Sequence, residues 1–167
     1  KTIANKVNDM DKLIDELTIY SRLDANRVLY TFVKFDVSEY FDDCCDEIGT
    51  ELDAAGIELN YRNHIKEPVI IAADPEQLKR VINNIISNSV KYMAEGRKGK
   101  IDIDLYDESD YVHIIIADNG KGIAGKDVSH IFERFYRTDE SRNSKQGGSG
   151  IGLAIVKKIV EDHKGKI

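Results

Sequence analysis

The spacing of apolar residues at the start of the chain predicts a helix over residues 1–26. Ile3, Met10 and Leu17 recur every seven positions, with further apolar residues beside them on a highly charged segment. A broad apolar stripe of this kind is typical of a helix that packs in a bundle. A helix packed on its own domain and one helix of a dimeric bundle both agree with the pattern, so both interpretations stay open.

Short apolar runs farther along predict strands. They lie at residues 31–37, 57–61, 69–72, 100–106 and 111–118. The polar stretch 107–110 would join the last two strands, and the chain reaches the start of another apparent strand at Ile167. Helices and strands do not alternate as a parallel fold requires. The order therefore predicts an α+β protein: a two-layer α/β sandwich with a mixed sheet and helices on one face, preceded by one amphipathic helix.

Capping residues set the expected limits of the helices. Ser38 is a candidate N-cap for a helix that Gly56 would end. Asp74 precedes Pro75, and Gln77 stands at the capping-box position, so a second helix is expected from Asp74 to about Tyr92. A long polar segment over residues 119–150 follows the last strand, and such segments are usually lids or disordered. The final helix is expected from near Ser149 to Glu161.

Composition narrows the possible partners. The 167 residues carry a net charge of −6, which argues against nucleic acid as the main partner but not against a nucleotide. No apolar run approaches the roughly 20 residues that a membrane helix needs. Cys44 and Cys45 are adjacent, and neighbouring thiols favour reduced cysteines in a cytoplasmic protein over a disulfide or a zinc site. The chain is expected to be a fragment of a longer protein that touches a membrane only through other parts.

The second helix carries polar residues that suit a phosphate and its metal ion. Asn84 and Asn88 are four residues apart and therefore project from one side, and Lys91 and Tyr92 end the helix. A neutral amide oxygen is a suitable ligand for Mg²⁺ that is already bound to phosphates, and a lysine one turn later reaches a phosphate oxygen. A solvated polar face is the simpler interpretation of this helix taken alone.

Two glycine-containing segments point to a nucleotide. Asp118 ends an apolar strand and is followed by Gly120 and Gly122; its carboxylate would accept a hydrogen bond from the exocyclic amine of adenine and disfavour guanine. Taken alone, the segment is more typical of a turn. A second segment opens the last helix, where free backbone N–H groups favour phosphate over a flexible hinge. It consists of Gly148, Ser149, Gly150, Ile151, Gly152 and Leu153.

One further match is treated as chance. Residues 120–126 fit the G-x-x-x-x-G-K pattern of a P-loop, but Asp127 follows in place of the Ser or Thr that would bind Mg²⁺.

The motifs together resemble the catalytic domain of sensor histidine kinases, over roughly residues 32–167. The resemblance identifies 84–92 as the N box, 118–122 and 148–152 as two glycine boxes, and Phe132 to Arg137 (FERFYR) as the F box. It implies the Bergerat fold, with ATP held between the N-box helix and a mobile lid. Residues 1–26 would be the second helix of a dimerisation and phosphotransfer hairpin, and 27–167 the ATP-binding domain, possibly without its last strand.

The resemblance also implies a role for each candidate residue. Asn88 would coordinate Mg²⁺, Lys91 would meet phosphate, and Tyr92 would lie by the nucleotide. Asp118 would bind adenine, with Gly120, Gly122 and the segment 148–153 around the nucleotide. Asn84, Lys91 and Arg137 would be the catalytic residues, with Arg137 a candidate contact of the γ-phosphate. The implied reaction transfers the γ-phosphoryl group to a histidine on a helix of the same protein or its dimer mate, with a response regulator as the next partner.

The sequence departs from the full family pattern in one feature, and other residues separate this interpretation from its alternatives. None of the histidines, at positions 64, 113, 130 and 163, is followed by the acidic residue and arginine of a phospho-acceptor motif, so the acceptor is expected elsewhere. ATPase-driven clamps of the gyrase, mismatch-repair and chaperone type resemble E-x-x-x-N, whereas Asn84 stands at the place of the water-activating glutamate. A nucleotide-binding adaptor is the third alternative, and the intact Asn88 and Asp118 argue against it.

Overall fold

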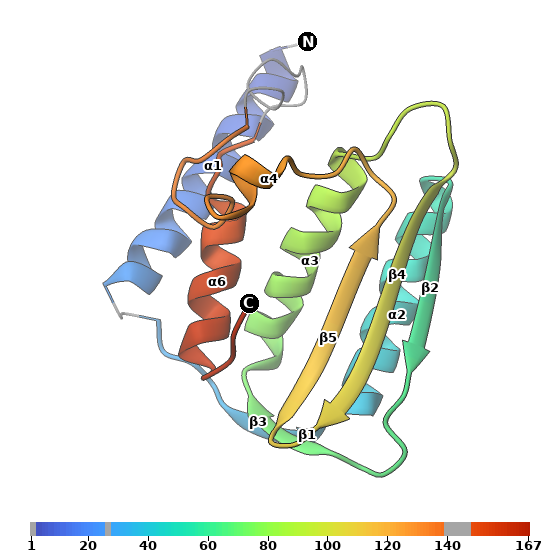
Figure 1. Ribbon diagram of the computed structural model, residues 1–167. Coiled ribbons are helices and arrows are strands. Elements are labelled where there is room, and N and C mark those ends of the chain that lie inside the picture. Colours follow the sequence, from blue (N-terminus) through green and yellow to red (C-terminus); the bar gives the residue numbers. More distant parts are fainter. Residues whose placement is uncertain (1–2, 26–27, 139–147) are drawn as a thin grey trace. The chain divides into compact units, whose positions relative to one another are not determined.

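The computed structural model describes residues 3–25, 28–138 and 148–167 (Figure 1). The chain forms two compact units. One is Thr31–Gly122, and the other combines Lys1–Tyr30 with Ile123–Ile167. Every described strand lies in the Thr31–Gly122 unit.

A mixed three-stranded sheet organises the Thr31–Gly122 unit. Strand β4 (Gly99–Glu108) lies between β2 (Ile57–Asn63), which runs parallel to it, and β5 (Tyr111–Asp118), which runs antiparallel. Strands β1 (Val33–Asp36) and β3 (Ile70–Ala73) form a separate antiparallel pair. The predicted mixed sheet is confirmed.

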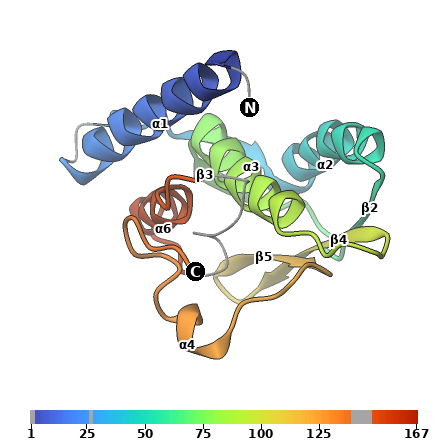
Figure 2. The same ribbon diagram turned by 90° about the horizontal axis from the view of Figure 1, so that it is seen from above.

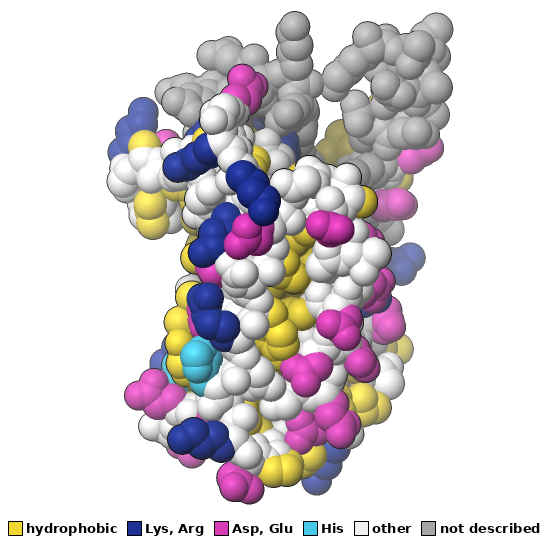
Figure 3. Space-filling view, turned by 90° about the vertical axis from the view of Figure 1, so that its right-hand side faces the viewer, with side chains coloured by type: hydrophobic (Ala, Val, Ile, Leu, Met, Phe, Trp, Pro, Cys, Tyr) yellow, Lys and Arg dark blue, Asp and Glu magenta, His cyan; other side chains and the backbone are white. Residues whose placement is uncertain are grey.

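Two helices cover one face of this sheet, as Figures 1 and 2 show: α2 (Val37–Ala54) and α3 (Pro75–Lys91). Odd-numbered residues of β4, such as Ile101, Ile103 and Leu105, are buried against them, because successive strand residues face opposite sides. The opposite side of α2 is acidic and exposed, and Figure 3 shows acidic side chains gathered there. The predicted two-layer arrangement is therefore confirmed, with the core between sheet and helices.

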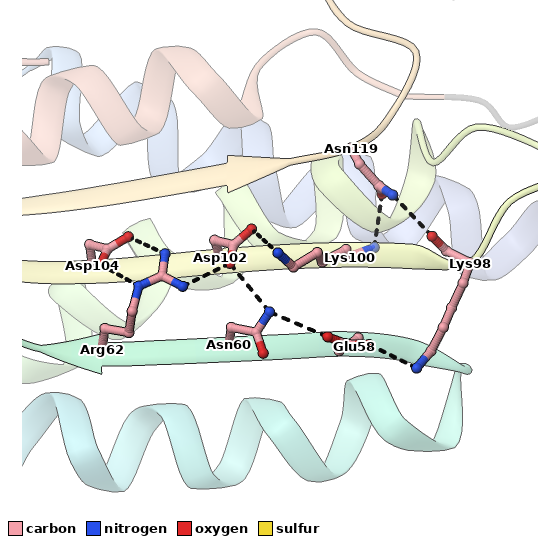
Figure 4. Close-up of polar contacts among 8 residues, drawn as sticks. All are labelled: Glu58, Asn60, Arg62, Lys98, Lys100, Asp102, Asp104 and Asn119. Atoms are coloured by element: carbon pink, nitrogen blue, oxygen red, sulfur yellow. Dashed lines mark hydrogen bonds and ion pairs between the residues drawn. The ribbon is translucent and has the colours of Figure 1, made fainter.

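On the outer face of the sheet, charged and polar side chains of β2 and β4 pair with one another, whereas β5 exposes Ile115 there. The Arg62 guanidinium lies 2.6 Å from Asp104 and 3.1 Å from Asp102, and Lys98 pairs with Glu58 at 2.9 Å (Figure 4). Asp104 accepts hydrogen bonds from Arg62 and, with a smaller effect, from His64. These bonds hold the pKa of Asp104 well below its usual range. On β2 and β4 the polar groups need no covering layer, because they pair with one another in water.

Several expected boundaries are wrong by a few residues. The N-cap of α2 is Asp36 and not Ser38: its carboxylate accepts hydrogen bonds from the backbone N–H groups of Ser38 and Glu39, at 2.8 and 3.2 Å. Asp74 caps α3 as predicted, through the N–H of Gln77 at 3.1 Å. The capping box itself is not formed, since the buried Gln77 Oε1 accepts no hydrogen bond from any described residue.

The β4–β5 connection is shorter than predicted. Glu108 pairs with Tyr111, so the turn is the dipeptide Ser109-Asp110 and not residues 107–110. Ser109 has a positive φ of 56°, the backbone conformation that a two-residue hairpin turn requires.

The other unit contains α1 (Ile3–Asp24), the short α4 (Gly125–Val128) and α6 (Gly152–Asp162). Helix α1 contacts α6, and Leu23 and Ile155 are buried. The expected strand at the end of the chain is wrong: residues 163–167 follow α6 without forming one. Within the described ranges, no helix is both long and apolar enough to cross a membrane.

Candidate functional site

Helix α3 presents the N-box residues near its C-terminal end. Asn84 and Asn88 are half-buried and lie one turn apart on the same side of the helix. The helix ends at Lys91, and Tyr92 is its C-cap. The Lys91 ammonium lies 5.0 Å from the centroid of the Tyr92 ring, within the range of a cation–π contact. The amides, the ammonium and the aromatic ring therefore occupy the last two turns of one helix.

The first glycine box is joined to this end of α3 by hydrogen bonds. Asp118 ends β5, and its Oδ2 accepts a hydrogen bond of 2.9 Å from the Ser89 hydroxyl of α3. Its Oδ1 accepts a second, of 2.8 Å, from the backbone N–H of Gly120. The backbone N–H of Lys121 donates to the Tyr92 carbonyl at 3.0 Å. The segment that begins at Asp118 is thus joined to the end of α3, where Lys91 and Tyr92 lie.

Gly120 occupies a position where no side chain fits. A Cβ built there would lie 2.7 Å from the Tyr92 carbonyl oxygen and 2.7 Å from Asp118 Oδ1. The first of these atoms is backbone and is fixed by its hydrogen bond to Lys121. The glycine therefore allows the chain after β5 to pack closely against the end of α3. The turn expected of the Asp-Asn-Gly sequence does not return the chain to the sheet as a hairpin.

The second glycine box opens α6 in the other unit. Ile151 is the N-cap and forms no side-chain capping hydrogen bond, so the first N–H groups of α6 have no cap from that residue. Gly150 has a φ of +72°, and a Cβ there would lie 2.9 Å from backbone atoms of Phe135 and Tyr136. The Gly150 carbonyl accepts a hydrogen bond of 2.9 Å from the Phe135 N–H. The glycine box and the F box therefore pack backbone to backbone.

A hydrogen bond fixes the F box to the short helix α4. The Tyr136 hydroxyl donates to Asp127 Oδ1 at 2.6 Å, and Asp127 is buried. Arg137, the predicted γ-phosphate contact, follows Tyr136 directly and is half-buried. Part of the predicted lid, residues 139–147, lies outside the described residues.

The structure adds Ser89 to the residues predicted from the sequence. Ser89 is 6% exposed, lies on the buried face of α3 after Ile82 and Ile86, and bonds directly to Asp118. The available signal was its spacing, since a hydroxyl three residues after Ile86 falls on the apolar face and there needs a partner.

Comparisons with known proteins show the family of the chain. Residues 73–167 match the family model described as histidine kinase-, DNA gyrase B- and HSP90-like ATPase. The chain belongs to this family. The matched range contains the N box, both glycine boxes and the F box.

Similar proteins within that family are sensor histidine kinases. The chain is 33% identical to sensor histidine kinase WalK of Bacillus subtilis over 98% of its own length and 26% of the relative's. It is 30% identical to the signal transduction histidine-protein kinase BaeS of Escherichia coli, covering 100% of this chain and 36% of that one. The solved catalytic domain of histidine kinase ThkA superposes with a TM-score of 0.65 at 26% identity, covering 80% of this chain and 82% of that one. The predicted resemblance to a histidine-kinase catalytic domain is confirmed. The chain spans about a third or less of WalK and BaeS.

Proposed function

We propose that this chain binds Mg·ATP and transfers the γ-phosphoryl group to a histidine on a separate helix. The observation that carries the proposal is the joining of Asp118 to the end of α3, where Lys91 and Tyr92 lie. A carboxylate offers only acceptors to a base edge, which suits the amine of adenine and not the carbonyl of guanine. A lysine close by suits the phosphates of the same nucleotide.

The remaining contacts are proposed on chemical grounds. Asn88 supplies a neutral oxygen on α3, and Mg²⁺ usually keeps several waters and is held by one or two side chains together with phosphates. The amide therefore fits Mg²⁺ that arrives with ATP. The N–H groups of Gly152 and Leu153, with Gly148 and Ser149 before them, suit phosphate oxygens at the start of α6. Arg137 would add positive charge at the γ-phosphate, because phosphoryl transfer depends on positioning and charge stabilisation.

Asn84 favours a kinase over an ATPase clamp. The amide cannot take a proton from water, whereas a glutamate at this place could, and general-base catalysis is typically worth about 10²–10⁴-fold. We therefore expect slow steady-state ATP hydrolysis. Introducing a base with Asn84→Glu is expected to raise hydrolysis, with Asn83→Glu, at an exposed neighbouring position, as the matched control.

The acceptor histidine is proposed to lie outside this chain. His113 is in β5 and His64 follows β2. His163 is the C-cap of α6, and its Nδ1 lies 2.8 Å from the Ile159 carbonyl, which accepts the hydrogen bond. Helix α1 exposes Met10 and Ile14, at 61% and 55%, together with Leu13 and Leu17. We propose that this stripe belongs to a dimerisation hairpin whose other helix carries the acceptor. A response regulator is the proposed next partner, and the proposed location is the cytoplasm.

Calorimetric titration tests the nucleotide part of the proposal. The full chain is expected to bind ATP in the presence of Mg²⁺ and to bind GTP at least about tenfold more weakly, which corresponds to about 1.4 kcal/mol. Asn88→Asp is expected to change the Mg²⁺ dependence of binding, because it adds a charge beside the metal and the phosphates. Equal affinities for ATP and GTP would rule out Asp118 as the adenine contact.

A further inference from the structure

We propose that Ser89 is a specificity-determining positioning residue, whose hydroxyl orients the Asp118 carboxylate toward the exocyclic amine of adenine. This inference rests on the proposed function, in which Asp118 is the adenine contact. It extends that function by assigning base selectivity to a residue of α3 that lies outside the N-box asparagines.

Packing does not orient the Asp118 carboxylate, because the residue is exposed. Two hydrogen bonds do so, one to each oxygen: 2.9 Å from the Ser89 hydroxyl to Oδ2 and 2.8 Å from the Gly120 N–H to Oδ1. An ionised carboxylate has about four acceptor positions. The two bonds leave acceptor capacity for a ligand while restricting rotation of the group.

The backbone beside Asp118 is held by a different side chain. Asn119 Oδ1 accepts a hydrogen bond of 2.8 Å from the Lys100 N–H, and its Nδ2 donates to the Lys98 carbonyl at 3.0 Å (Figure 4). The Asn119 N–H also donates to the Lys100 carbonyl, at 3.1 Å. These bonds continue the β4–β5 pairing past its last residue pair. Since Asn119 fixes the main chain, the contribution of Ser89 is confined to the carboxylate itself.

The donor is rigid as well as close. Ser89 is 6% exposed and lies on the buried face of a helix, so its Cα cannot shift without moving α3. A serine hydroxyl has one proton to donate, and here the proton goes to Asp118. Removing the hydroxyl leaves Oδ2 without this partner and lets the carboxylate rotate. The expected loss therefore falls on ligands that bond to that carboxylate.

The test compares two nucleotides on variants of the full chain. ATP carries the exocyclic amine, and purine riboside triphosphate has hydrogen in its place. Ser89→Ala is expected to raise the Kd for Mg·ATP by about five- to tenfold, the range for one hydrogen bond to a charged group partly replaced by water, and to leave the Kd for the amine-free nucleotide within about twofold. Asn83→Ala, at an exposed position on the same helix before the N box, is the control and should change neither.

A second pair of variants separates hydrogen bonding from packing. Ser89→Thr and Ser89→Val have nearly the same shape, and only the threonine keeps a hydroxyl. Threonine is expected to retain the preference for ATP over the amine-free nucleotide, and valine to lose it. Equal losses for both nucleotides in the alanine or valine variant would overturn the inference and make Ser89 a packing residue. If the wild-type chain binds the Mg²⁺ complexes of both nucleotides with equal Kd, the adenine assignment of Asp118 is overturned first, and this inference falls with it.

Discussion

Replacing Gly120 by alanine is expected to weaken ATP binding strongly. The new methyl group would lie 2.7 Å from the Tyr92 carbonyl oxygen and from Asp118 Oδ1, far inside van der Waals contact. To make room, the chain must move away from the end of α3, which stretches the hydrogen bond from Lys121 to Tyr92, and Asp118 must rotate away from Ser89. The site must re-form both hydrogen bonds to bind ATP as the wild type does. At about 0.5–1.5 kcal/mol each, they predict a loss of about 1–3 kcal/mol in the free energy of ATP binding.

This loss corresponds to roughly a 5- to 150-fold increase in the Kd for Mg·ATP, measured by calorimetric titration. Gly49→Ala in α2 is the matched control, because a Cβ at Gly49 meets only the Leu59 side chain, at an ordinary contact distance of 3.5 Å, and its φ is not positive. The control should keep the wild-type Kd. A Gly120→Ala variant whose Kd stays within about twofold of wild type would refute the argument that close packing of this glycine shapes the site.

Further predictions concern the base contact, the lid, α1 and the buried thiols. Asp118→Asn should cost about 1–3 kcal/mol of ATP affinity by titration, because it mismatches one acceptor; unchanged affinity would exclude the contact. Hydrogen exchange over residues 124–146 should be fast without nucleotide and slower with ATP, and uniform protection of the free chain would count against a lid. Analytical ultracentrifugation should show weak association at most through α1, since half of a helical hairpin cannot bury its stripe; a tight micromolar dimer would contradict this. Burial raises the pKa of the Cys45 thiol to about 12, so the thiol stays protonated and slow toward Ellman's reagent at pH 8 until urea unfolds the chain. The stabilisation linked to this proton is complete below the unfolded pKa of about 8.5 and is lost as pH rises from there toward 12; stability that increases over that range would contradict it.

The sequence predicts elements better than their ends. Apolar runs predicted the strands of the mixed sheet, because burial against a core imposes that spacing directly. Caps depend on which nearby side chain reaches the free N–H groups, and Asp36 and Ser38 are both suitable residue types. Asp36 accepts the bonds because it holds extended backbone before the helix, with φ −73° and ψ 126°. Sequence alone does not supply that angle.

The sequence predicted the chemical types of the site residues but not the hydrogen bonds that hold them in place. Asn88, Lys91 and Asp118 stand out because amides, a cation and a carboxylate in a fixed order suit a nucleotide and its metal ion. Which atoms hold Asp118 depends on the packing of β5 beside α3, and that packing is a tertiary feature. Ser89 and Asn119 therefore emerged from the structure, where Ser89 bonds from α3 to Asp118 and Asn119 bonds to Lys100 of the neighbouring strand β4.

Transfer of labelled γ-phosphate tests the kinase assignment most directly. The chain is mixed with Mg·ATP labelled at the γ position and with an acceptor helix pair of a histidine kinase supplied as a separate polypeptide, and the products are separated before and after acid treatment. The account predicts label on the acceptor histidine, lost in acid as phosphohistidine is, with no label on this chain, little free phosphate, and reduced transfer by Asn88→Asp. Rapid release of free phosphate by this chain alone, with no label on the acceptor, would contradict the account and favour the ATPase clamp.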